Sequence, residues 1–233
     1  MKIEILSTGS KGNCAIISNA DGTSKLMIDC GLKFKTIIAN KAFGSFHDYD
    51  ALLITHRHTD HSLSRKDFEN AGMEIIAPDS EYYKGGTNAI ESPHWHIVRF
   101  DVIHDVPCNG YLILDKIDDK SLWWATDFSD FKKFIRGATA YAIEVNYSQK
   151  IIDEYVEHTP TEDIDFNHLS KTMNTHFSLE EVIETFGELP EKPNTLIALH
   201  GSEMFSNPQS TLDLLTGLAE NVYVAKPHTV INI

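Results

Sequence analysis

Short apolar runs, separated by glycine, asparagine, aspartate and serine, dominate the first half of the chain. The runs at 2–6, 14–18 and 25–29 predict an antiparallel meander of strands. The continuous apolar run at 51–55 is typical of a strand that is buried on both faces. The same patterns predict later strands at 74–78, 96–103, 110–115, 121–126, 140–145, 195–200 and 222–225.

Helical patterns are fewer than strand patterns, and we expect helices at 33–40, 62–71, 148–157, 178–187 and 209–219. Ser178 and Glu181 predict a capping box at the start of one of them. The acidic, proline-containing segment 153–166 predicts an exposed loop or lid. The element order favours an α+β fold with two mixed sheets face to face and helices outside, a four-layer αββα sandwich. No linker composition interrupts it, so we expect one domain over 1–233.

Composition narrows the class of protein. Hydrophobic residues make up 42% of the 233 positions, which excludes wholesale disorder. Lys and Arg number 20 against 34 Asp and Glu, and the resulting net charge of −14 disfavours broad, non-specific binding to duplex nucleic acid. No apolar run approaches the ~18 residues of a membrane span, and no secretory signal is recognised. Cys14, Cys30 and Cys108 lack metal-ligand spacing, so we expect reduced thiols in a cytoplasmic protein without a membrane partner.

The segment THRHTDH (55–61) places three histidines and an aspartate directly after a predicted buried strand. Alternate residues of an extended segment point to one side, so His56 and His58 can hold one ion while Asp60 and His61 turn toward a second. Imidazole and carboxylate ligands suit Zn²⁺, Mn²⁺ or iron, and the lack of thiolates disfavours a closed structural zinc site. The competing interpretation is a cluster of surface histidines.

This segment matches the HxHxDH signature of the metallo-β-lactamase superfamily, so the chain resembles that superfamily. Its members carry a histidine, a metal-bridging aspartate and a last histidine at later strand ends, and His104, Asp127 and His200 follow predicted strands in that order. A turn aspartate and a histidine bonded to backbone are the alternatives for Asp127 and His200. The resemblance implies two divalent ions, zinc or manganese with iron as a third candidate. The implied ligands are His56, His58 and His104 for the first ion, Asp60, His61 and His200 for the second, and Asp127 between them.

Five further segments resemble, in order, the YycJ-like branch of the superfamily, which is linked to 5′-to-3′ exonuclease activity. They are STGSKGNC (7–14), HDVPCNGYLI (104–113), EVNYS (144–148), NHLS (167–170) and LHGSEMFSNP (199–208). On this resemblance Asp60 orients the nucleophile and accepts its proton, and His168 donates a proton or holds a phosphate. A packed structural histidine is the alternative for His168. Asn13 lies in a turn that either faces the site or forms a simple hairpin, and Asn146 and Ser170 are either supporting or solvated residues.

Some features fall outside the resemblance. The sequence TEDIDF precedes NHLS where the branch tends to carry basic residues. The basic cluster FKKFIR (131–136) predicts a solvated helix face, with a phosphate contact as the alternative. His94 and His96 share the i, i+2 spacing but lack a neighbouring third ligand, so an ordinary strand is expected there. His176 is interpreted as a surface or packing residue.

These residues favour a binuclear metal-dependent hydrolase, and above all a phosphodiesterase acting on a short nucleic acid or a nucleotide through a hydroxide shared by the ions. A thioester or lactone hydrolase is the alternative, because bound metals also polarise a carbonyl group. A non-catalytic relative is disfavoured, because no ligand position is lost. Relatives of this branch are often dimers, so a homodimer is a candidate assembly.

Overall fold

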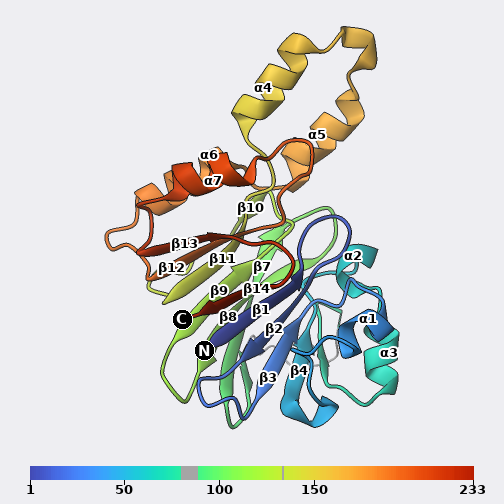
Figure 1. Ribbon diagram of the computed structural model, residues 1–233, viewed down its shortest axis with the longest axis vertical. Coiled ribbons are helices and arrows are strands. Elements are labelled where there is room, and N and C mark those ends of the chain that lie inside the picture. Colours follow the sequence, from blue (N-terminus) through green and yellow to red (C-terminus); the bar gives the residue numbers. More distant parts are fainter. Residues whose placement is uncertain (80–88, 133) are drawn as a thin grey trace.

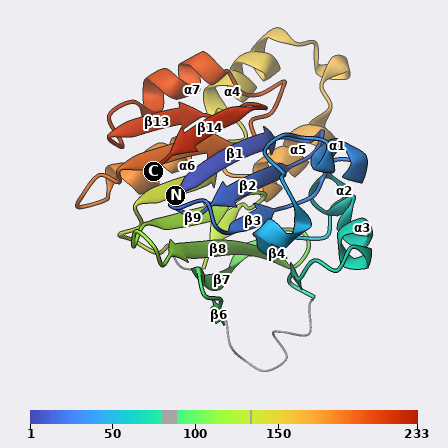
Figure 2. The ribbon, with the colours of Figure 1, turned by 60° about the horizontal axis from the view of Figure 1, so that its bottom comes forward.

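The computed structural model describes residues 1–79, 89–132 and 134–233. Its strands form two mixed sheets that stack face to face (Figures 1 and 2). The first sheet has the order β14 (Thr229–Asn232), β1 (Lys2–Ser7), β2 (Cys14–Ser18), β3 (Lys25–Ile28), β4 (Tyr49–Leu53) and β5 (Ile75–Ile76). The second has the order β10 (Asp130–Phe131), β7 (Trp95–Ile103), β8 (Cys108–Asp115), β9 (Ser121–Ala125), β11 (Ala140–Glu144), β12 (Thr195–Leu199) and β13 (Asn221–Val224), and β6 (Ala89–Glu91) pairs with β7.

Helices cover the outer face of each sheet. The first sheet packs against α1 (Phe34–Ile38) and α3 (Arg65–Asn70), with α2 (Thr59–Ser62) and the 3₁₀ turn Phe46–Asp48 beside them. The second packs against α6 (Leu179–Gly187) and α7 (Pro208–Leu215). Between the sheets lies a third apolar layer that includes Ile5, Leu26, Tyr111 and Ile197. The predicted four-layer αββα sandwich is therefore confirmed.

Strand direction brings distant residues to one edge of the molecule. The predicted antiparallel meander of β1, β2 and β3 is confirmed, while β3 and β4 run parallel. In the second sheet β8 is antiparallel to both β7 and β9, and β9, β11 and β12 run parallel. The carboxyl ends of β7, β9, β11 and β12 consequently share one edge, which is where open sheets of this kind bind ligands.

A helical hairpin projects from the body between β11 and α6 (Figure 1). It consists of α4 (Gln149–His158), the 3₁₀ turn Thr161–Asp163 and α5 (Phe166–Thr175), and we call it the arm. The prediction of a loop over 153–166 is wrong for the part that belongs to α4, although the segment is largely exposed as expected. The helix α5 was not predicted. The residues that it buries are Leu169 and Thr172, which are too few to give the periodic apolar pattern of an amphipathic helix.

The helix predicted at 131–136 is not formed by the residues of this range that the structure describes. Phe131 belongs to the short strand β10, and Lys132 and residues 134–136 are irregular. Phe128, Phe131 and Phe134 pack around Trp123, so aromatic burial sets this conformation rather than the charges. Lys133 lies outside the described residues.

Two chemical expectations can be compared with the structure. The three cysteines are buried and unpaired, in agreement with the expectation of thiols. Among the described residues, no helix combines the length and apolar character needed to cross a bilayer.

Candidate metal centre

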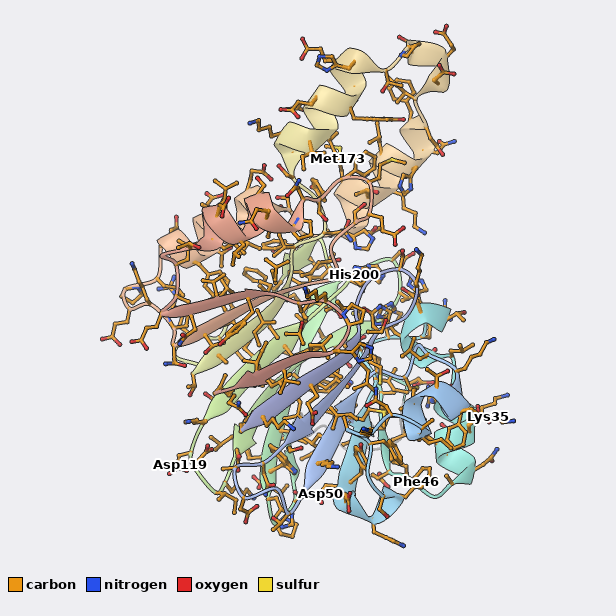
Figure 3. All side chains as sticks on the ribbon, in the orientation of Figure 1. Lys35, Phe46, Asp50, Asp119, Met173 and His200 are labelled. Atoms are coloured by element: carbon orange, nitrogen blue, oxygen red, sulfur yellow. The ribbon has the colours of Figure 1, made fainter. Side chains whose placement is uncertain are left out.

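The predicted ligands come together because each follows a strand whose carboxyl end reaches the same region. His56 and His61 follow β4, and His104 follows β7. Asp127 follows β9, and His200 follows β12. Figure 3 shows His200 where the body meets α5. The sequence-predicted residues, separated by up to 144 positions (200 − 56), thus occupy one centre.

Three imidazoles form the first set of donor atoms, which we call the three-histidine group: His56, His58 and His104. The His56 Nε2 atom lies 3.0 Å from His58 Nδ1, and His104 Nε2 lies 3.3 Å from the same atom. Nitrogens sharing a tetrahedral zinc at about 2.0–2.1 Å lie about 3.3 Å apart, so this spacing suits one ion. Burial lowers the pKa of His56 to about 2, which keeps its ring in the neutral form that binds metals.

Asp60, His61 and His200 form the second set, which we call the mixed group. The buried Asp127 lies between the two sets, with its Oδ2 atom 2.8 Å from His61 Nε2 and 3.4 Å from His200 Nε2. Burial raises the pKa of the Asp127 carboxyl, but the facing His200 and His61 rings outweigh it and hold that pKa well below its usual range. Donor atoms of Asp127, His56 and His61 also lie within 4.8 Å of one another, so Asp127 is close to both sets.

Asp127 Oδ2 and His200 Nε2 are buried and make no hydrogen bond of regular geometry among the described residues, although Asp127 Oδ2 lies within 3.4 Å of the facing nitrogens of His61 and His200. Buried imidazole nitrogens and a carboxylate oxygen that face one another without regular hydrogen-bond geometry form an arrangement that a shared cation stabilises. Backbone strain points the same way, because Asp127 and His200 adopt φ angles of 56° and 55° in the left-handed region. The donor set therefore fits divalent metal ions.

Comparison with known proteins places this geometry in context. No protein-family model matches the sequence. The exodeoxyribonuclease WalJ of Streptococcus pneumoniae is 29% identical over 180 residues, which cover 65% of this chain and 64% of the relative, so the match spans just under two thirds of that protein. Among solved structures, the metallo-β-lactamase fold protein YhfI from Bacillus subtilis aligns over 99% of both chains with a TM-score of 0.72 and 17% identity. Human tRNase Z, short form, aligns over 100% of this chain and 99% of its own with a TM-score of 0.62 and 14% identity.

The chain has the metallo-β-lactamase fold. Backbone hydrogen bonds from two neighbouring turns hold the ligand-bearing segment 55–61 in place. The Asn13 amide N–H donates to the Asp60 carbonyl at 2.7 Å, and the Cys30 N–H donates to the His61 carbonyl at 2.8 Å. A Cβ on Gly31 would lie 1.6 Å from the Asp60 carbonyl oxygen, so only glycine permits this approach. The turn that holds Asn13 thus faces the site, and Asn13 Nδ2 lies 2.8 Å from His61 Nε2.

Buried carboxylates behind the mixed group were missed at the sequence level. Asp29 Oδ2 accepts a hydrogen bond from His61 Nδ1 at 2.7 Å. Burial lowers the pKa of His61, but Asp127 and Asp29 outweigh it and raise that pKa to about 10. Glu144 Oε1 lies 2.9 Å from His200 Nδ1, so it fixes that ring as well. The signal available for both was their position at predicted strand ends.

His176 was interpreted as a packing residue, and the structure places it in the centre instead. Its Nδ1 atom lies 2.7 Å from Glu144 Oε1 and 3.6 Å from Asp127 Oδ1. The signal that could have found it is its position two residues before the Ser178 cap of α6, where the predicted capping box with Glu181 is confirmed.

The centre opens into a cleft of about 420 Å³. His168 lines this cleft from the exposed side of α5, with its ring 5.7 Å from the Phe205 ring. Asn146 is buried and donates to the His200 carbonyl at 2.9 Å, so it supports a ligand loop. Ser170 is exposed and contacts Asn174 instead.

The remaining basic and histidine features pair with carboxylates outside the predicted ligand set. Lys132 pairs with Asp101 at 3.3 Å. His96 belongs to β7 as expected and pairs with Glu91, and His94 Nδ1 lies 3.3 Å from Asp50 Oδ2.

Proposed function

We propose that this protein is a metal-dependent phosphodiesterase that holds one divalent cation at the three-histidine group and a second at the mixed group, with Asp127 as a ligand of both. The observation that carries the proposal is the convergence of seven imidazole and carboxylate side chains on one centre, five of which line the open cleft. The names of WalJ and tRNase Z denote nucleases, which favours phosphodiesters over carboxylic esters as the substrate class. Zn²⁺ or Mn²⁺ at these positions would supply an activated water and Lewis acidity toward the phosphoryl oxygen.

The side chains of this chain divide the remaining work. Asp60 lines the cleft with a side chain 29% exposed, and its Oδ2 atom lies 3.5 Å from His61 Nε2. From there it orients the attacking water and accepts its proton. His168 contacts the substrate from α5, where it either donates a proton or holds a phosphate oxygen.

His176 is a second candidate for the proton that the leaving oxygen needs. It lines the cleft, and its Nδ1 atom is engaged by Glu144, which leaves Nε2 as the ring nitrogen available to substrate. The buried Glu144 fixes the ring orientation and favours the protonated ring.

The first experiment tests the reaction class. Protein loaded with Mn²⁺ or Zn²⁺ is assayed with bis-p-nitrophenyl phosphate, a labelled DNA single strand and a cyclic nucleotide, and in parallel with S-lactoylglutathione and an acyl lactone. We expect metal-dependent cleavage of at least one phosphodiester. Turnover of the carboxylic substrates alone would contradict the proposal and favour the thioester or lactone hydrolase.

A second experiment separates the two histidines. An alkoxide leaving group needs a proton, whereas p-nitrophenolate does not. The variant that removes the proton donor, His176→Gln or His168→Gln, loses kcat on a dinucleotide far more than on bis-p-nitrophenyl phosphate. The other variant shows the same loss on both substrates.

A further inference from the structure

The arm forms one wall of the cleft and reaches well beyond the body (Figures 1 and 2). A small apolar cluster joins it to the rest of the molecule, with Ile152, Ile164 and Leu169 from the arm against Tyr147 and Phe205. A substrate entering from the arm side therefore meets the residues of α5 that line the cleft.

The inner face of α5 is polar and carries a cation. Positions i, i+3, i+4 and i+7 share one helix face, and here they are His168, Lys171, Thr172 and Thr175, all of which line the cleft. Among the described residues that line the cleft, Lys171 is the one lysine or arginine. No ion pair to Lys171 occurs within the described parts of the chain. Its ammonium group is thus available to a phosphate oxygen of the substrate.

The exposed part of the arm that does not line the cleft, which we call its outer surface, has the opposite charge. Between 149 and 175 there are six carboxylates and two lysines. All six carboxylate residues are exposed: Asp153, Glu154, Glu157, Glu162, Asp163 and Asp165. Lys150, the second lysine, lies 3.9 Å from Glu154. At physiological ionic strength exposed charges act over about 8 Å, so a strand of phosphates running along the arm meets net repulsion.

We propose that the arm is an electrostatic selector, in which Lys171 binds a substrate phosphate at the cleft while the acidic outer surface excludes long polyanions. The substrate class is then a short phosphodiester, a nucleotide-sized diester or a frayed single-stranded end, and not a duplex. This inference rests on the proposed phosphodiesterase function. Duplex DNA carries one charge per about 1.7 Å and is stiff, so it cannot bring one phosphate to Lys171 without placing others beside the arm.

The test compares a dinucleotide, a 20-nucleotide single strand and the matching blunt duplex on the metal-loaded full chain. We expect kcat/KM to be at least about tenfold lower for the duplex than for the dinucleotide, and to rise for the duplex as salt screens the arm. Equal kcat/KM values, or duplex cleavage that weakens with salt, would overturn the inference. Failure to cleave any of the three would overturn the proposed phosphodiesterase itself and this inference with it.

Variants of the arm give a second measurement. In E157Q/E162Q/D163N, three exposed carboxylates of the arm lose their charge, and we expect duplex kcat/KM to rise about tenfold with the dinucleotide value unchanged. The matched control E74Q/D119N/E191Q removes the same charge from exposed positions on the body. We expect it to leave the ratio of duplex to dinucleotide kcat/KM unchanged. If both triple variants shift the ratio equally, net charge and not the arm is responsible.

Lys171 is tested separately. We expect Lys171→Ala to raise KM for the dinucleotide about tenfold with kcat little changed, and Lys171→Arg to restore KM. Lys150→Ala, on the same arm but not among the residues that line the cleft, is the control and keeps the wild-type KM. An unchanged KM in Lys171→Ala, in protein whose unfolding temperature matches wild type, would remove Lys171 from the inference.

Discussion

The two groups of candidate ligands differ in the residues that contact the second ring nitrogen of each ligand imidazole. Each ligand imidazole of the mixed group has a buried carboxylate on its second ring nitrogen. Asp29 lies 2.7 Å from His61 Nδ1, and Glu144 lies 2.9 Å from His200 Nδ1. Both carboxylates are fully or almost fully buried, so their charge acts on the rings at short range and with little screening.

The three-histidine group is supported by weaker or more exposed partners. His56 Nδ1 lies 3.1 Å from the Thr55 hydroxyl, and His104 Nδ1 lies 3.2 Å from the Thr175 carbonyl. The side chain of His58 is 35% exposed, and its acidic neighbour Asp105 is 40% exposed. A carboxylate on the second nitrogen raises the basicity of a metal-binding imidazole more than a neutral partner does. We therefore expect the mixed group to hold its ion more tightly.

Removing the residue that lies between the groups gives the largest effect. Asp127→Ala deletes a donor close to both and leaves His61 and His200 facing an empty space. We expect activity to fall well beyond the ~10- to 100-fold that is typical of supporting residues, together with a loss of bound metal measured by elemental analysis. Asp130→Ala, an exposed aspartate on the neighbouring β10, is the control. Full activity in Asp127→Ala would refute the assignment of this residue.

The next effect comes from Glu144, whose carboxylate lies among the donor atoms of Asp127, His176 and His200 and contacts both histidine rings. Both rings contact Glu144 Oε1, while Oε2 accepts from the Phe128 and Phe177 N–H groups, so in Glu144→Gln the NH₂ group must face one of these two pairs of donors. We expect a ~10- to 100-fold loss of activity or metal affinity. Glu184→Gln, an exposed residue of α6, should match wild type. If Glu144→Gln keeps its activity, the buried carboxylates are not what distinguishes the mixed group.

Stepwise removal of metal tests the comparison directly. Titration with a chelator should release one equivalent before the other, with about a tenfold difference in apparent affinity. The His58→Ala variant should lose the weakly held equivalent and keep the other. Elemental analysis after each addition of chelator measures this, and release of both ions in one step would show that the two groups are equivalent.

The ligands within one short motif could be predicted from their spacing, whereas contacts between distant segments depend on the tertiary structure. His56, His58, Asp60 and His61 could be predicted because their spacing after an apolar run is itself the signature. The structure brought the later ligands His104, Asp127 and His200 to them, as expected from predicted strand ends. The ligand assignment itself stays a prediction until metal is measured.

Asp29, Glu144 and His176 could not be predicted as partners, because their contacts depend on register between strands and loops far apart in sequence. The Asp29–His61 contact spans 32 residues and the Glu144–His200 contact spans 56. The strand β14 was missed for the same reason, since a four-residue segment is ordered by pairing with β1 at the other end of the chain. The first helix of the arm, α4, agrees with the helix predicted at 148–157. The second helix, α5, was missed because it buries little apolar surface, and its N-terminus depends on the Asp165 side chain accepting from the His168 N–H.

The smallest expected effect comes from Ser178, and it tests whether the cap of α6 helps to position His176. Ser178 caps this helix two residues after His176, and Ser178→Ala removes the bond that its hydroxyl accepts from the Glu181 N–H at 3.1 Å. We expect about 1 kcal/mol less unfolding free energy, seen as a fall of about 2–4 °C in Tm, with kcat unchanged. Such a result would assign the position of His176 to Glu144 rather than to the helix. A Ser178→Ala variant that unfolds normally but loses kcat would instead show that the α6 cap holds His176 in place, and would extend the support of the mixed group beyond its carboxylates.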